Sequence, residues 1–313
     1  MVLVVGESLV DVVERADGSR TEHAGGSPAN VAVGLGRLGI KPTLATTLAH
    51  DEHGALVRMH LAESGVRLLP GLNELDRTST AVATIDSDGS ADYAFDLTWD
   101  PGRIWAEEVP EIVHTGSIAA FLGPGADDVE DTLRRLAPMC IVTFDPNIRP
   151  SLLPDHGAAT ERMRALLALA DLVKVSDDDL AWLAPDADPA DTARSWLDAG
   201  PAAVVVTMGA RGARTFTRRG SVASRTRATR VVDTVGAGDA FMAGLIAALT
   251  DEDVTGLTGS SDLREADLSL WRRTSELASW CSAITVGRAG AQPPWRAELD
   301  AALTTGAVAA ARP

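Results

Sequence analysis

The chain has 313 residues, of which 45% are hydrophobic and 23% are charged, a composition typical of a folded globular protein. Its 44 acidic and 28 basic residues give a formal net charge of −16, which argues against nucleic acid or an anionic membrane as the main partner. No apolar run approaches the length of a membrane-spanning helix, and the N-terminal residues lack the pattern of a signal peptide. We therefore expect a cytoplasmic protein in which Cys140 and Cys281 are reduced and buried.

Short apolar and β-branched runs alternate with helical patterns along most of the chain. Such alternation predicts an α/β fold, with a mostly parallel sheet covered by helices on both faces. The length fits one domain that spans residues 1–313. The expected strands are residues 3–5, 43–47, 112–115, 141–145, 172–175, 203–207 and 230–232, and the expected helices include residues 30–38, 129–136, 160–169 and 190–199.

Two stretches, residues 9–14 and 81–95, break this rhythm because they carry β-forming residues with no crossover helix nearby. The second stretch contains Asp88-Gly89, a dipeptide that favours a hairpin turn. We expect these strands to form a small antiparallel flap beside the main sheet. Residues 255–262 are rich in Gly, Ser and Thr and predict a flexible loop.

The segment from Val231 to Phe241 predicts an anion-binding site. A short β-branched strand is expected to run through a loop with Gly236 and Gly238 into a helix, whose first amides point outward and carry partial positive charge. Asp239 in the first helical turn has two interpretations, as a complement to the helix dipole or as a general base beside the anion. A Rossmann fingerprint needs a small residue where Phe241 stands, and the sequence contains no Walker A motif.

A second glycine-rich segment lies near the N-terminus. Ser27 is expected to cap a helix with Pro28 at its first position, and Asn30 in the first turn is able to reach a ligand hydroxyl. Gly25-Gly26 allows a ligand to approach the backbone closely. The downstream glycines at 34, 36 and 39 match GxGxxG, but they lie inside the helix, where close helix packing is the better interpretation.

Together the two segments closely resemble the two signatures of the ribokinase-like (pfkB-type) carbohydrate kinases. The first is Gly25-Gly26-x-x-x-Asn30, and the second is Asp233-Thr234-x-Gly236-Ala237-Gly238-Asp239. The resemblance implies a three-layer α/β/α sandwich with a small β-sheet lid, whose strands fall within about residues 9–23 and 78–100. It also implies transfer of a phosphoryl group from ATP to a sugar, and an ordered lid excludes water that would otherwise hydrolyse ATP.

The resemblance also implies roles for particular residues. Asp239 matches the catalytic base, and Gly236, Ala237 and Gly238 match the anion hole. The positions implied to bind sugar are Asp11, Gly25, Gly26, Asn30, Phe95, Arg149 and Asp239. The positions implied to border the nucleotide are Lys174, Ser176, Thr207, Gly209, Gly212, Gly236 and Gly238.

Three further segments resemble the fructokinase branch of this family: residues 144–149 (Phe-Asp-Pro-Asn-Ile-Arg), residues 174–180 (Lys-Val-Ser-Asp-Asp-Asp-Leu) and residues 114–117 (His-Thr-Gly-Ser). They imply fructose as the acceptor. The alternatives are 2-keto-3-deoxygluconate, whose carboxylate Arg149 is able to meet, and another sugar or a nucleoside. A catalytically inactive sugar sensor is an alternative from a different functional class.

The resemblance implies MgATP as the phosphoryl donor, with Mg²⁺ reached through water by Asp179, which stands where relatives have glutamate. Asp233 is a candidate ligand for a monovalent cation such as K⁺. We also expect a homodimer formed through the lid, because its apolar residues, including Val10, Val12 and Val82, need a partner surface. The alternative is a monomer whose flap folds fully over its own active site.

Overall fold

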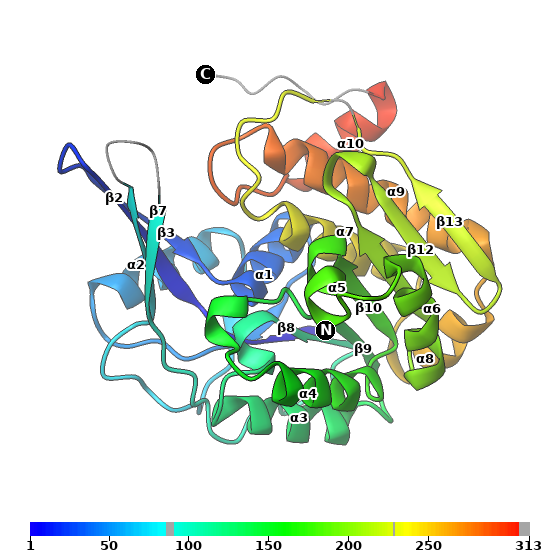
Figure 1. Ribbon diagram of the computed structural model, residues 1–313, viewed down its shortest axis with the longest axis horizontal. Helices are drawn as coiled ribbons and strands as arrows, with labels where there is room; N and C mark the ends of the chain where they lie inside the picture. The colour runs from blue at the N-terminus through cyan, green and yellow to red at the C-terminus, as the bar shows by residue number, and fades with distance from the viewer. Residues whose placement is uncertain (86–90, 228, 307–313) are drawn as a thin grey trace.

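A computed structural model of the 313-residue chain describes residues 1–85, 91–227 and 229–306. The expected hairpin turn at Asp88-Gly89 lies outside these residues. In the described part of the chain, one large sheet and one small sheet are present, and the small sheet projects from the body of the molecule (Figure 1).

The large sheet confirms the expected α/β class. Within the described residues it has nine strands in the order β13-β12-β11-β10-β9-β8-β1-β4-β5. The pairs from β11 through β5 are parallel, whereas β12 runs antiparallel to its two neighbours. The strands are β1 (Val2–Val5), β4 (Thr43–Ala45), β5 (Arg67–Leu68), β8 (Ile112–Gly116), β9 (Ile141–Asp145), β10 (Leu172–Ser176), β11 (Ala203–Thr207), β12 (Ala213–Thr217) and β13 (Gly220–Ser224).

Helices cover both faces of this sheet and give three layers. Alternate residues of β1 show the division, because Val2 and Val4 join one apolar cluster and Leu3 and Val5 join the other. The first cluster includes residues of α1 (Ser27–Arg37), α2 (Glu52–Glu63), α7 (Ala237–Asp251), α8 (Gly256–Glu265), α9 (Leu268–Val286) and α10 (Arg296–Thr305). The second includes residues of α3 (Gly125–Leu136), α4 (His156–Leu167), α5 (Asp177–Leu183) and α6 (Pro189–Ala199).

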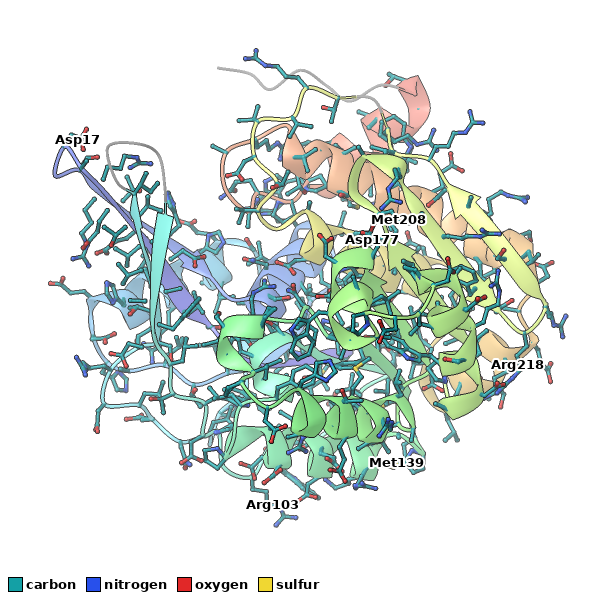
Figure 2. The ribbon with its side chains drawn as sticks, in the orientation of Figure 1. Asp17, Arg103, Met139, Asp177, Met208 and Arg218 are labelled. Atoms are coloured by element: carbon teal, nitrogen blue, oxygen red, sulfur yellow. The ribbon has the colours of Figure 1, made fainter. Side chains whose placement is uncertain are left out.

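The small sheet, which we call the lid, has the order β3-β2-β6-β7. Its strands are β2 (Leu9–Arg15), β3 (Arg20–Gly25), β6 (Thr80–Ile85) and β7 (Ala91–Asp96). The expectation of an antiparallel flap is wrong in one respect, because the central pair β2 and β6 runs parallel. The long connection from β2 to β6 passes through α1 and the edge of the large sheet, so the two lid hairpins meet side by side in the same direction. Asp17 marks the outer tip of the β2–β3 hairpin, and Arg218 marks the far side of the molecule (Figure 2).

Val10 and Val12 do not need a partner subunit, contrary to the sequence-based expectation. They are 0% and 1% exposed, and they pack in the same apolar cluster as Val57 and Leu61 of α2. Val82 packs against this cluster as well. One face of the lid is therefore covered by the protein itself.

The expected strand at residues 230–232 is wrong. Val231 and Val232 are 61% and 55% exposed, and the amide of Val232 donates to the Val286 carbonyl at the end of α9. The segment lies beside a helix terminus, where no neighbouring strand is available to pair with it. Its β-branched residues are therefore not sufficient to form a strand.

The expected loop at residues 255–262 is also wrong, because α8 occupies residues 256–265. The small side chains that suggested a loop instead allow close packing over the sheet. A Cβ on Gly259 would lie 2.6 Å from Ile141 Cδ1, and the Ser260 hydroxyl donates to Asp171. Tertiary contacts thus stabilise a helix that local propensity disfavours.

Glycines inside α1 permit close packing, as expected from their position within a helix. A Cβ on Gly36 would lie 1.9 Å from the Ser64 carbonyl oxygen, and one on Gly34 would lie 2.6 Å from the Ala243 Cβ of α7. The backbone at Ser64 has no flexible side chain with which to absorb such a contact. The glycine at 36 therefore fixes how closely α1 approaches the end of α2.

We expect Gly36→Ala to lower the free energy of unfolding by about 1–3 kcal/mol, the range for overpacking a well-packed interior. Urea denaturation followed by circular dichroism measures it. Gly287→Ala is the matched control, because its added Cβ meets nothing closer than 3.4 Å, and it should change stability by less than about 1 kcal/mol. Equal stabilities of the two variants would contradict this account of the α1 packing.

Candidate active site

The loop that precedes α7 ends at Gly236, whose φ of 72° lies in the left-handed region that favours glycine. A Cβ at this position would lie 2.5 Å from the Ala291 Cβ, so glycine is required for space as well. The amide of Ala237 donates to the Thr234 carbonyl at 3.2 Å. The amides of Gly238 and Asp239 lie in the first turn of α7 and have no partner within the helix. The predicted anion hole is therefore a helix N-terminus with two outward amides.

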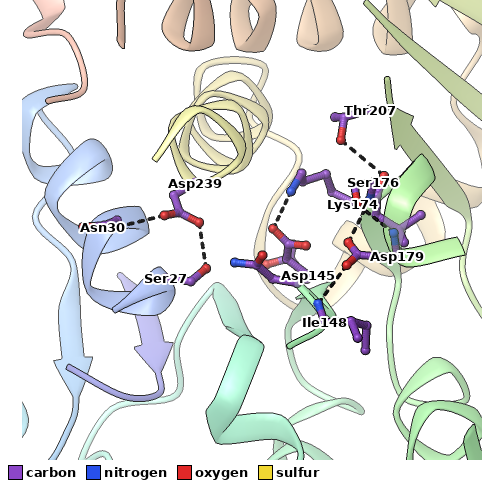
Figure 3. A network of polar contacts seen from close by, with 12 residues as sticks. Ser27, Asn30, Asp145, Ile148, Lys174, Ser176, Asp179, Thr207 and Asp239 are labelled. Carbon is purple, nitrogen blue, oxygen red and sulfur yellow. Dashed lines mark hydrogen bonds and ion pairs between the residues drawn. The ribbon is translucent and has the colours of Figure 1, made fainter. Parts of the chain in front are cut away.

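Asp239 is buried in this first turn and is held by α1. The Ser27 hydroxyl donates to Asp239 Oδ1 at 2.7 Å, and the Asn30 side-chain amide donates to Oδ2 at 2.8 Å (Figure 3). The prediction that Ser27 caps α1 is wrong, because the N-cap is Gly26 and Ser27 is the first helical residue. Its hydroxyl orients the carboxylate of Asp239 instead, a contact that local sequence does not signal.

Asp11 of the lid faces the same region. A Cβ on Gly25 would lie 2.1 Å from Asp11 Oδ2, so the glycine makes room for this carboxylate. Burial raises the pKa of Asp11, His23 and Arg149 act against this rise, and Asp239 adds to it. His23, Arg149 and Asp239 therefore each lie within electrostatic reach of Asp11. The strand register places Asp11, Ala81 and Phe95 in one row across the lid, so Phe95 shares the face of Asp11.

Glu7, which was not predicted, is a buried carboxyl in the segment between β1 and β2. Its Oε2 accepts the Ala119 amide at 2.9 Å, whereas its Oε1 is buried with no hydrogen-bond partner. Burial raises its pKa to about 7, and hydrogen bonds from Ala119 and Ser117 and the charge of Arg149 limit the rise. Its backbone carbonyl also lies 2.6 Å from where a Cβ on Gly26 would stand. Glu7 thus couples the first turn after β1 to the glycines before α1.

Four of the predicted nucleotide residues line one cavity of about 430 Å³: Thr207, Gly209, Gly212 and Gly238. Thr207, Gly209 and Gly212 form one wall, and Ala237 and Gly238 lie at the α7 N-terminus. Gly212 has a φ of 88°, and a Cβ there would lie 2.2 Å from the Ser224 carbonyl oxygen. The structure therefore brings the β11 turn and the anion hole to the same cavity.

Arg227 also lines this cavity, and no sequence motif indicated it. Its guanidinium lies 4.9 Å from the centre of the Trp280 ring and pairs with Glu276. Ser176, by contrast, is the N-cap of α5, where its hydroxyl accepts the Asp179 amide at 2.9 Å. The structure thus gives Ser176 a capping role, and its contact with a nucleotide stays a prediction.

Lys174 is the buried cation closest to the anion hole. Its Nζ lies 2.6 Å from Asp145 Oδ2, and a Cβ on Gly238 would lie 2.9 Å from this Nζ (Figure 3). Burial disfavours the charge of Lys174, but Asp145, with Asp179 and Asp239 at longer range, outweighs burial, so the pKa of Lys174 is raised. Burial also raises the pKa of Asp145 to about 6, so the pair is ionised at neutral pH.

The two predicted metal residues, Asp179 and Asp233, accept hydrogen bonds from backbone amides. Asp179 accepts the amides of Ile148 at 2.8 Å and Ser176 at 3.1 Å. Asp233 accepts the amides of Val235 at 3.0 Å and Gly290 at 2.8 Å. Among the residues that the structure describes, no group of three His, Cys, Asp or Glu side chains is arranged to hold a metal ion. The cation roles of Asp179 and Asp233 remain predictions.

The raised pKa of Glu7 gives a pH-dependent stability. The folded protein keeps this proton up to about pH 7, whereas the ordinary pKa of a glutamate in an unfolded chain is 4.5, so the free energy of unfolding falls as pH rises between these values. Glu7→Gln removes this pH-dependent loss of stability, because glutamine does not titrate. We expect the free energy of unfolding of the variant, relative to that of the unsubstituted protein, to increase by roughly 2–3 kcal/mol between about pH 5 and about pH 8. Urea denaturation measures it.

Glu161→Gln is the matched control for this prediction, because Glu161 is exposed on α4. Its stability should follow that of the unsubstituted protein over the whole range. The prediction is wrong if Glu7→Gln shows the same pH dependence as this control.

The model of the pfkB family carbohydrate kinases matches residues 1–298 of the chain. A fructokinase from Rhizobium leguminosarum bv. trifolii is 35% identical over 260 residues, which cover 80% of this chain and 79% of that protein. The structure is similar to that of a fructokinase from Xylella fastidiosa with bound ATP, with a TM-score of 0.83, 25% identity and coverage of 97% of this chain and 98% of that chain.

It is also similar to a double mutant of fructokinase from Vibrio cholerae O395 in its form with fructose, ADP and a potassium ion. Here the TM-score is 0.79 at 25% identity, with coverage of 96% of this chain and 97% of that chain. The family model spans almost the whole of the described fold, and the protein is therefore a member of the pfkB family of carbohydrate kinases.

Proposed function

We propose that the protein is an ATP-dependent fructokinase, which transfers the γ-phosphoryl group of ATP to a hydroxyl of fructose. The observation that carries the proposal is the placement of Asp239. Its buried carboxylate lies in the first turn of α7, beside the nucleotide cavity on one side and within electrostatic reach of Asp11 on the other. The fructokinase relatives, including one structure with bound ATP and one with fructose and ADP, support the donor and the acceptor.

In this mechanism Asp239 accepts the proton of the attacking sugar hydroxyl. Ser27 and Asn30 fix the orientation of its carboxylate, and each of its oxygens keeps a lone pair for the substrate. The outward amides of Gly238 and Asp239 stabilise the charge that develops on the transferred group. Asp11, with Gly25, Gly26, Asn30, Phe95 and Arg149, binds the sugar and closes the site to water.

The cation requirements are part of the same proposal. Mg²⁺, when bound with ATP, neutralises charge on the phosphates. Asp179 is placed to act on it through water, because its two backbone hydrogen bonds leave further lone pairs on the carboxylate. Asp233 holds residues 235 and 290 together and is our candidate for a K⁺ site; the potassium ion in the Vibrio cholerae structure supports this choice.

The acceptor is tested by a screen for ADP release with MgATP over fructose, 2-keto-3-deoxygluconate, ribose, tagatose and adenosine. We expect fructose to give the highest kcat/KM. The keto acid is the main alternative, because the cation of Arg149 acts on both Asp11 and Glu7 and so lies near the sugar. An inactive sensor would release ADP with none of the five, but such a protein has no need of the oriented Asp239.

We further propose a cytoplasmic location. Cys140 and Cys281 are free and buried, which fits a reducing compartment. Within the described residues, no helix has the length and apolar character needed to cross a membrane.

We also propose a homodimer formed through the lid. Val13, Ala81 and Ala83 lie in adjacent strand positions on the lid face that carries Asp11, and all three are half-buried. The other face already packs on α2, so this face is the one available to a second subunit. Light scattering at micromolar concentration should give the mass of a dimer. Val13→Lys should shift it toward the monomer, whereas Thr84→Lys on the opposite face should not; a monomer mass for the unsubstituted protein would contradict the proposal.

Asp239→Asn tests the mechanism directly. We expect kcat for fructose phosphorylation to fall by about 100-fold or more, because the amide cannot accept the proton, while the affinity for fructose stays nearly unchanged. Steady-state kinetics give kcat, and calorimetric titration gives the affinity. Turnover close to that of the unsubstituted protein in a folded variant would exclude Asp239 as the base.

Asp11→Asn is the matched control for this measurement. It replaces a carboxylate by an amide on the sugar side, with no expected role in proton transfer. Its main effect should be a higher KM for fructose at an unchanged KM for ATP.

A further inference from the structure

Asp145, at the end of β9, forms a buried ion pair for which the proposed mechanism has no role. Its Oδ2 lies 2.6 Å from Lys174 Nζ, and the two side chains are 1% and 5% exposed. Asp145 Oδ1 is buried without a hydrogen-bond partner. An ion pair so deeply buried carries a large desolvation cost, and replacement by apolar residues is often neutral or stabilising. Stability alone therefore does not account for it.

Several carboxylates near Lys174 favour its protonated form, and they do so to different extents. Burial alone drives a lysine toward its neutral form. Asp145 contributes most to offsetting burial, followed by Asp179 of α5 and Asp239 of α7 at longer range. His114 of β8 is also near, but burial and Lys174 lower its pKa to about 3, so it is neutral. Asp145 is thus the only carboxylate among these that Lys174 bonds directly.

The position of Lys174 indicates that its positive charge acts at the anion hole. A Cβ on Gly238 would lie 2.9 Å from Lys174 Nζ, so the ammonium lies against the backbone of the anion hole. An ammonium has three N–H donors, and Asp145 accepts one of them. Two donors therefore remain on an ammonium that lies close to Gly238. A phosphate held by the amides of Gly238 and Asp239 comes within reach of Lys174.

We propose that Asp145 is a positioning residue that keeps Lys174 protonated and aimed at the anion hole, where Lys174 holds the terminal phosphate of ATP. The proposal rests on the proposed function, because it assumes that ATP binds at the α7 N-terminus. It assigns Asp145 no contact with the sugar or with the transferred group. Its consequences therefore appear in the binding of ATP and not in the binding of the sugar.

The test is calorimetric titration with ATP and excess Mg²⁺, without any sugar, between about pH 7 and about pH 9.5. Four proteins are compared: the unsubstituted protein, Asp145→Asn, Lys174→Met and the double variant. In Asp145→Asn the buried lysine has lost its bonded counter-charge, so we expect it to lose its proton within this range. The ratio of its ATP affinity to that of the unsubstituted protein should fall about 10-fold or more from the lowest to the highest pH.

Lys174→Met should bind ATP about 10-fold or more weakly, by a factor that does not change with pH. The double variant should match Lys174→Met, because Asp145 acts only through Lys174. An affinity ratio for Asp145→Asn that stays constant with pH overturns the proposal. Additive effects of the two substitutions overturn it as well.

Thermal unfolding of each variant checks that it is folded. Should Asp145→Asn not fold, Asp145→Glu replaces it, since this change keeps the charge and moves it by one methylene. ATP should then bind more weakly by a factor that is constant with pH, and unchanged affinity overturns the proposal. The assay also separates the two proposals. Absence of ATP binding to the unsubstituted protein overturns the proposed function, whereas normal binding with an unaltered Asp145→Asn profile overturns only the role of Asp145.

Discussion

The proposed function requires the first turn of α7 to remain open to a phosphate while neighbouring segments pack closely around it. Glycine at 236 is required because Ala291 leaves no room for a side chain, and glycine at 238 leaves space for Lys174 Nζ. On the remaining side, α1 approaches closely enough for Ser27 and Asn30 to bond Asp239. The site depends on this close approach, because a carboxylate acts as a directed base only when its orientation is fixed.

The large sheet supplies the rigid support for this arrangement. Asp145 and Ser176 end the parallel strands β9 and β10, and Thr207 ends β11, so all three lie at the carboxyl edge of the sheet. Ligands of open α/β sheets bind at this edge, where loops leave the strands and helices begin. The lid then supplies Asp11 from a separate sheet. The sugar and nucleotide sides of the proposed site thus belong to different structural layers that meet at α7.

The sequence allowed the α/β class and the start of a helix after Gly236 to be predicted, because the glycine pattern at 236–239 is local and its geometry follows from helix termini. Anion binding at this helix N-terminus stays a prediction. The errors arose where distant contacts decide the structure. Residues 230–232 have strand-forming side chains but no strand beside them, and residues 256–265 form a helix because Gly259 packs on Ile141. The contact of Ser27 with Asp239 joins residues 212 positions apart, and nothing in the local sequence signals it.

The overall charge of −16 has little influence on a phosphate at the α7 N-terminus, because charges more than about 8 Å away are largely screened at physiological ionic strength. The balance of charges close to the α7 N-terminus matters more. Asp145, Asp179 and Asp239 all act on Lys174, so three carboxylates surround one ammonium. One ammonium and the partial charges of the outward amides are too little positive charge to balance three carboxylates and a triphosphate. In the proposed function a divalent cation bound with the nucleotide would offset this excess of negative charge, and Asp179 would contribute to holding it while Asp145 is paired with Lys174.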